Sequence, residues 1–164
     1  MKKTLFLSML FGLALSASTA FAQTEVTGAN GVTVERPEGW EDATGNDRAA
    51  FTFREATTNS QIEIISTPLL TAEVKDVFYN TFHEALKAAN FLQQSQTEKT
   101  LGTHEGTETI YSFEHSGAAL TVAIFEFVSG STAWVVVSYM GSDSFDELRP
   151  AFEGVISTLK FSTN

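Results

Sequence analysis

The sequence predicts an α+β domain, in which a mainly antiparallel sheet of six or seven strands is covered by a long mid-chain helix and a C-terminal helix. Two observations support this fold class. The stretches 107–115, 118–128 and 132–140 are rich in strand-forming residues and are separated by short turns. The stretch 71–89 instead repeats its apolar residues at helical spacing.

The first half of the chain supplies further strands. Residues 32–35 alternate in polarity and then meet Pro37-Glu38-Gly39-Trp40, which predicts a strand followed by a turn. Two more strands, 49–54 and 61–66, are joined through a polar turn. The stretch 95–101 has the weakest strand pattern of the set.

Two helices are expected. The C-terminal one starts near Ser144, because Ser144 and Glu147 have the spacing of a capping box, and Pro150 should kink it or delay its start. The mid-chain helix presents one apolar face, formed by Val74, Val77, Phe78, Phe82, Ala85, Leu86 and Ala89.

Hairpin turns at Ser116-Gly117 and Ser129-Gly130 predict a register for the three long strands. Phe113 then faces Leu120, Tyr111 faces Val122, Ile124 faces Val135, and Phe125 faces Trp134. We expect the main core on the sheet face that carries Tyr111, Phe113, Leu120, Val122, Ile124, Val135, Val137 and Tyr139. The opposite face is also apolar, so both faces need a cover, with one helix on each or both helices largely on one.

The N-terminus has the features of a cleavable secretory signal peptide. Lys2 and Lys3 precede an apolar run, 5–17, which is too short to span a bilayer, and Ala20-Phe21-Ala22 forms a cleavage signal. We therefore expect cleavage before Gln23. The chain then divides into a signal peptide (1–22), a flexible lead-in (23–30) and a single α+β domain (31–164).

Charge and cysteine content narrow the possible functions. The formal net charge is −10, and loss of Lys2 and Lys3 with the signal peptide takes it to −12. Such a surface disfavours nucleic acid and anionic lipid as partners. The chain has no cysteine, which excludes thiol catalysis, cysteine metal sites and lipid attachment through cysteine. We expect a periplasmic or secreted protein, without membrane insertion after cleavage.

The chain resembles the Mog1/PsbP-like fold group, which includes the DcrB-like periplasmic proteins. The resemblance rests on the string Val32-Thr33-Val34-Glu35-Arg36-Pro37-Glu38-Gly39-Trp40, on Phe51-Thr52-Phe53, and on the C-terminal string Ile156-Ser157-Thr158-Leu159-Lys160-Phe161. It implies this group's element order and a role in binding a protein partner without chemistry. The matching motifs are short and none is an active-site motif, so no functional residue is carried over.

The turn around Trp40 is the first candidate binding site. Glu38, Glu41, Asp42 and Asp47 cluster around this tryptophan. Acids beside an exposed indole can hold a sugar or a cation, or perform acid–base work on a glycoside. In so acidic a chain, the same cluster is also typical of a solvated surface turn.

A stripe of small polar residues is the second candidate. Ser112, Thr121 and Ser138 align in the predicted register, with Phe125 and Trp134 beside them. The stripe can form the floor of a groove for an extended peptide or an apolar ligand. Alternatively, its small side chains let a helix approach the sheet closely.

Glu126 is out of place, because the register puts this acid on the expected main apolar face, opposite Ala133. It must be paired, protonated or close to water at the strand end. If it were buried beside a cavity, it would be a site candidate. His83-Glu84 is not completed to a zinc-binding helix, since Lys87 stands where the second histidine is required. We assign no catalytic residue, metal or cofactor.

These observations favour a non-catalytic binding or accessory protein of the bacterial envelope, whose partner is another envelope or secreted protein. Two alternatives stay open. One is an envelope hydrolase that uses the acids near Trp40, and the other is a carrier of a small apolar ligand in an enclosed cavity.

Overall fold

The computed structural model describes residues 24–28 and 31–161. The predicted signal peptide, residues 1–22, lies outside the described residues. In the part that is described, neither helix has the length and apolar character needed to cross a membrane.

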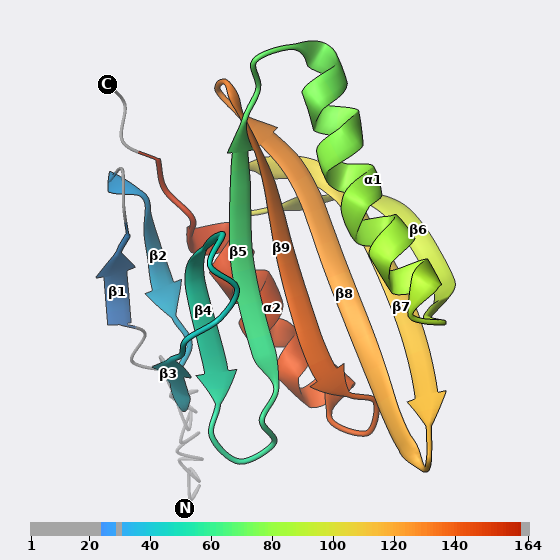
Figure 1. The fold of residues 1–164 in the computed structure, drawn as a ribbon. Helices are drawn as coiled ribbons and strands as arrows, with labels where there is room; N and C mark the ends of the chain where they lie inside the picture. The colour runs from blue at the N-terminus through green and yellow to red at the C-terminus, as the bar shows by residue number, and fades with distance from the viewer. Residues whose placement is uncertain (1–23, 29–30, 162–164) are drawn as a thin grey trace, which may run out of the picture.

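A seven-stranded antiparallel sheet organises the domain, which confirms the predicted fold class (Figure 1). Its spatial order is β3-β4-β5-β9-β8-β7-β6, and each neighbouring pair is antiparallel. The strands are β3 (Trp40–Asp42), β4 (Ala49–Glu55), β5 (Gln61–Pro68), β6 (Leu92–Leu101), β7 (His104–His115), β8 (Ala118–Ser129) and β9 (Thr132–Gly141).

The segment 23–30, expected to be a flexible lead-in, instead contains strand β1 (Thr24–Thr27). This strand pairs with β2 (Thr33–Arg36) in a separate two-stranded sheet. Two contacts explain why it is ordered: Val26 packs against the core, and Lys160 forms an ion pair with Glu25 at 3.1 Å. The prediction missed β1 because its only long apolar side chain is Val26.

One helix covers each face of the sheet, which settles the alternative left open by the sequence (Figure 1). Helix α1 (Ala72–Ala88) lies over the face that was expected to form the main core. Helix α2 (Phe145–Thr158) lies over the opposite face, and the larger buried cluster is there. The expectation of the main core was therefore wrong, because β2 and the C-terminal segment add their apolar residues to the α2 side.

The predicted register holds for one hairpin and is shifted in the other. Phe113 pairs with Leu120, as expected. In the β8–β9 hairpin the turn residues are Gly130 and Ser131, so Phe125 pairs with Val136 instead of Trp134, Ile124 with Val137 instead of Val135, and Glu126 with Val135 instead of Ala133. A shift of two residues leaves every side chain on its predicted face, since strand side chains alternate.

Helix α1 is seated on the sheet by a face that overlaps the predicted one but also includes polar residues. Phe78, Phe82 and Leu86 pack against the sheet, but Val77 is 66 % exposed. Tyr79 and His83 turn toward the sheet instead, because the tyrosine hydroxyl and the imidazole find hydrogen-bonding partners there. No residue of α1 is fully buried, although the sheet residues beneath it, such as Val122 and Ile124, are.

Helix α2 begins as predicted but without the expected capping box. The Ser144 hydroxyl donates to the carbonyl of Gly141 at 3.1 Å and does not cap the helix. Pro150 lies inside the helix, which nevertheless starts at Phe145, so the proline does not delay the start.

An ion-pair network holds α2 against strands β6 and β7. Arg149 donates to Glu108 at 2.6 Å and to Glu153 at 3.0 Å, while Lys99 lies 2.7 Å from Glu153 and 3.4 Å from Glu108. Burial alone would raise the pKa of Glu153, but hydrogen bonds and charge from Lys99 and Arg149 outweigh it and lower this pKa below its ordinary value.

We expect this network to make stability depend on acidity. A carboxylate whose pKa is lower in the folded than in the unfolded state stabilises the fold above its unfolded pKa, and this contribution disappears as the pH falls through the folded value. Glu153→Gln should therefore lower the urea midpoint at pH 7, and the difference from the wild type should narrow toward about pH 3. Glu147→Gln, an exposed change on the same helix, is the control. An equal loss at both pH values would contradict this role for Glu153.

Candidate functional site

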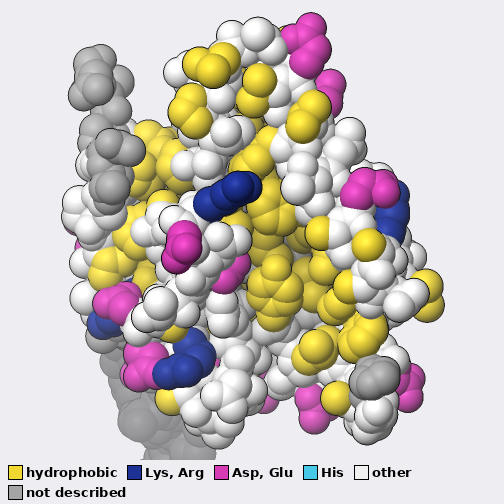
Figure 2. Space-filling model, viewed as in Figure 1, with side chains coloured by type: hydrophobic (Ala, Val, Ile, Leu, Met, Phe, Trp, Pro, Cys, Tyr) yellow, Lys and Arg dark blue, Asp and Glu magenta, His cyan; other side chains and the backbone are white. Residues whose placement is uncertain are grey.

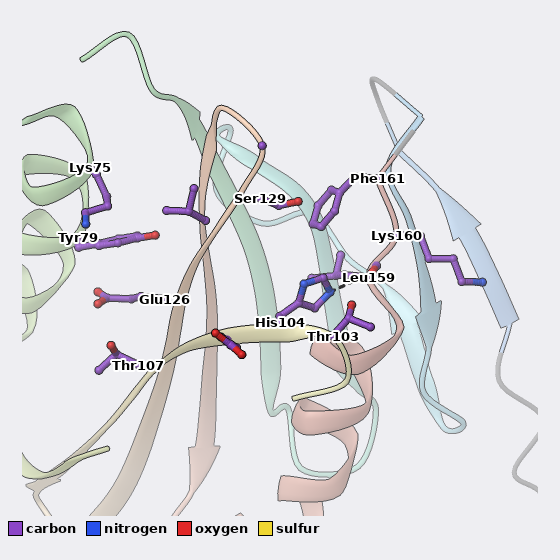
Figure 3. Close-up of a pocket in the computed structure, with 13 residues that line it drawn as sticks. Lys75, Tyr79, Thr103, His104, Thr107, Glu126, Ser129, Leu159, Lys160 and Phe161 are labelled. Atoms are coloured by element: carbon purple, nitrogen blue, oxygen red, sulfur yellow. Dashed lines mark hydrogen bonds between the residues drawn. The ribbon is translucent and has the colours of Figure 1, made fainter. Parts of the chain in front are cut away.

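Strands β7 and β8 separate at one end of the sheet. The last pair of residues that joins β7 to β8 at this end is Gly106 with Phe127. Strand β8 continues to Ser129 and stays paired with β9 up to that residue. The first residues of β7 pair only with β6. A cavity of about 790 Å³ opens at this place, between α1 and the segment that follows α2 (Figure 3). We call it the notch, and it is lined by Lys75, Tyr79, Thr103, His104, Glu105, Thr107, Glu126, Val128, Ser129, Gly130, Leu159, Lys160 and Phe161.

The start of β7 is drawn away from β8 by its contacts with the end of α2. His104 is buried, its Nε2 lies 3.1 Å from the carbonyl oxygen of Leu159, and its ring packs against Phe127 and Phe161. In the preceding turn, Gly102 has φ +62°, and a Cβ there would lie 2.6 Å from the carbonyl oxygen of Ser157. Only glycine tolerates both constraints, so this turn can dock on α2.

Glu126 lies in the notch on the α1 side of the sheet and is only 8 % exposed. The Oε1 atom of Glu126 is 2.8 Å from His83 Nε2, an ion-pair contact that is not aligned as a hydrogen bond. His83 Nδ1 is 2.6 Å from the hydroxyl of Tyr111. The imidazole of His83 therefore lies between the Tyr111 hydroxyl and the Glu126 carboxylate.

Tyr79 forms the α1 wall of the notch. Its hydroxyl donates to the carbonyl of Phe127 at 2.6 Å. Burial, and then the nearby Glu126 charge, raise the pKa of Tyr79 well above its ordinary range. Burial and the charges of Glu126 and Glu84 also raise the pKa of Tyr111. Both phenols therefore stay protonated.

The rim of the notch carries two lysines and an exposed apolar side chain. Lys160 is 3.1 Å from Glu25, and Lys75 is 3.8 Å from Asp76, so each ammonium has a carboxylate of its own. Val128 is 44 % exposed, although it belongs to a strand of the central sheet. The notch thus combines an apolar contact, a strand edge and a buried acid.

The turn around Trp40, the first sequence candidate, is folded differently from a sugar-binding site. Trp40 is 6 % exposed and belongs to the α2-side core, at the start of a short strand that was predicted as a turn. Glu41 pairs with Arg54 at 2.8 Å and Asp42 pairs with Arg36 at 2.9 Å, while Glu38 is exposed. These contacts suit a structural turn better than an acid–base pair beside an exposed indole.

The small polar stripe, the second sequence candidate, is not a continuous row. Thr121 pairs with Ser112, but Ser138 is opposite Ala123 because of the shifted register. Ser138 is fully buried, whereas the Ser112 hydroxyl accepts a hydrogen bond from Gln94. The Thr121 hydroxyl is hydrogen-bonded to Ser142 at 2.9 Å. Trp134 is buried, with its ring 4.8 Å from that of Phe161.

The structure thus brings Glu126 together with Tyr79, His83 and Tyr111, none of which the sequence analysis had placed beside it. The sequence did hold a sign of this grouping, because Tyr79 and His83 are four residues apart and therefore lie on one side of α1. Within residues 24–28 and 31–161, no group of three or more His, Asp or Glu side chains is placed to hold a metal ion.

Solved structures of similar fold exist, although no protein-family model and no curated protein sequence matches the chain. Cyanobacterial PsbP from Synechocystis sp. PCC 6803 matches 93 % of this chain and 99 % of its own, with 12 % identity and a TM-score of 0.60. LpqN of Mycobacterium tuberculosis, involved in cell envelope biogenesis, matches 88 % of this chain and 92 % of its own, with 16 % identity and a TM-score of 0.60.

A protein of Bacteroides thetaiotaomicron VPI-5482 matches 87 % of this chain, with 17 % identity and a TM-score of 0.60. This chain spans about half of that one, 48 % of its length. Identities this low show a shared fold and carry no function with them. The structural match to cyanobacterial PsbP over most of both chains confirms the resemblance drawn from the sequence, and the chain has the Mog1/PsbP-like fold.

Proposed function

We propose that this chain is an exported, non-catalytic accessory protein that binds another envelope or secreted protein. The observation that carries the proposal is the notch, an open cavity of about 790 Å³ at a strand edge with an exposed apolar residue, Val128, on its rim. The two histidines near it are engaged in structural contacts, His104 with Leu159 and His83 with Tyr111 and Glu126. Such a site is suited to contact rather than to chemistry.

Export rests on the features of residues 1–22 given above, and the similar fold of LpqN, a protein of cell envelope biogenesis, agrees with an envelope location. The polar lining of the notch, with Tyr79, Thr107 and Glu126, favours a protein partner over a small apolar ligand.

An affinity pull-down tests the proposal. The tagged full chain is expressed in its native envelope, crosslinked briefly and purified, and we expect a stoichiometric protein partner. Val128→Asp should abolish recovery of that partner, because it places a charge where apolar contact is required. Val77→Asp changes a valine of α1 that is more exposed than Val128 and does not line the notch, so it should leave recovery unchanged. Absence of a partner, or equal recovery with both variants, would contradict the proposal.

A further inference from the structure

We propose that the notch binds an extended peptide segment of the partner, which adds to the free edge of β8 and directs a basic group to Glu126. This inference rests on the proposed function and specifies the chemistry of its partner. It is carried by three features of the same place: a strand edge, a buried acid and the charge balance of the rim.

The strand edge is the first feature. Beyond Phe127, β8 continues for two residues, 128–129, whose neighbours on the β7 side are missing from the register. Backbone groups at such an edge are a template for another strand. The start of β7 cannot close the gap, because His104 and Gly102 fix it on the end of α2.

The buried acid is the second feature. Side chains of an added strand alternate, so every second one points to the α1 side of the sheet, where Glu126 lies. The Oε1 atom of Glu126 carries part of the carboxylate charge and is buried without an aligned hydrogen bond, 2.8 Å from His83 Nε2. A lysine, an arginine or an N-terminal ammonium of the peptide would compensate this charge and complete its hydrogen bonding.

The charge balance of the rim is the third feature. Lys75 and Lys160 line the notch, but Asp76 and Glu25 compensate them. Glu105 adds a second carboxylate to the lining. The formal net charge of the chain, −10, also favours a basic partner at longer range.

The opposite sides of the notch provide apolar contacts for neighbouring side chains of the peptide. Val128 stands on the rim, and Phe161 lies on the α2 side of the cavity (Figure 3). Residues next to the basic one point to the other face of the added strand, toward Phe161. The motif we infer is therefore a basic residue flanked by β-branched or aromatic residues.

A peptide selection tests this inference. Random seven-residue peptides displayed on phage are selected on the full chain, and the enriched heptapeptide is labelled for fluorescence anisotropy. We expect a basic residue at a fixed position, and binding about tenfold weaker or more with Glu126→Gln. Glu63→Gln is the matched control, because Glu63 is also 8 % exposed on the α1 side but holds the β3–β4 loop through Asn46. It should leave binding unchanged.

Amide hydrogen exchange gives a readout of strand addition. The heptapeptide should slow exchange at residues 128–130 in the wild type, whereas residues of the β7–β8 turn at the far end of the sheet should not respond. Circular dichroism confirms that Glu126→Gln is folded. Should that variant unfold, the same peptide with glutamine in place of its basic residue makes the comparison on the wild-type chain.

The outcomes separate the two proposals. Enriched peptides without a basic residue, equal binding to Glu126→Gln, or no enrichment overturn the inference. A partner whose recovery depends on Val128 would still support the proposed function in each of these cases. Conversely, a heptapeptide that needs Glu126 while no envelope partner is recovered would support the peptide site and contradict the accessory role.

Discussion

Replacing His83 by leucine should destabilise the protein by about 2–4 kcal/mol, because it leaves buried polar groups without a partner. His83 joins α1 to the sheet through Glu126 at 2.8 Å and Tyr111 at 2.6 Å. Its removal leaves the Glu126 carboxylate buried without its neighbour, and removes a hydrogen-bonding partner of the Tyr111 hydroxyl. The loss is measured as the free energy of unfolding in urea at pH 7.

The double variant His83→Leu/Glu126→Leu is the control for this prediction. Removing both polar partners avoids the unpaired buried charge, so the double variant should recover a large part of the stability lost by the single one. A loss below about 1 kcal/mol for His83→Leu would contradict the role of the pair in seating α1.

Phe152→Ala should cost a similar amount, about 3–5 kcal/mol, for a different reason. Phe152 is fully buried on α2 and belongs to the larger core cluster, together with Trp40 and Val34. Its truncation leaves a cavity between α2 and the sheet. Leu148→Ala, at a half-buried position of the same helix, should cost clearly less. Equal losses in urea unfolding would show that the α2 face is not the main core.

The faces of the three long strands, β7, β8 and β9, could be predicted because a period of two is visible in the sequence. Tyr111, Val122 and Ile124 share a buried face, as expected, even though the β8–β9 register is displaced by two residues. Which face holds the larger core was not predictable from the hairpins alone. It depends on β2 and the C-terminal segment, which meet only through the tertiary fold, as in the pairing of Thr33 with Lys160.

The seating of α1 shows where local pattern gave a wrong answer. Hydrophobicity placed Val77 and Ala85 on the buried face, but Tyr79 and His83 occupy that side. The contacts that reverse the expectation are polar and come from distant strands. A prediction from helical spacing uses only the apolar residues, so it cannot include these polar contacts.

The candidate site was predictable in one residue only. An acid in an apolar strand face made Glu126 conspicuous, because a buried carboxylate needs compensation. The notch beside it arises because β8 extends beyond the last residue that pairs with β7. The position at which β7 leaves β8 depends on where Gly102 and His104 dock on the end of α2. The acids around Trp40 attracted attention through composition, but the fold buries the indole and pairs Glu41 and Asp42 with arginines.

Site-specific photo-crosslinking tests most directly whether the notch is the contact surface. A photoreactive phenylalanine derivative replaces Val128 on the rim or Thr57 in the exposed β4–β5 turn, and the full chain is irradiated in its native envelope. The account predicts a discrete crosslinked protein for position 128 and none for position 57. A crosslink at position 57 with none at position 128 would contradict it.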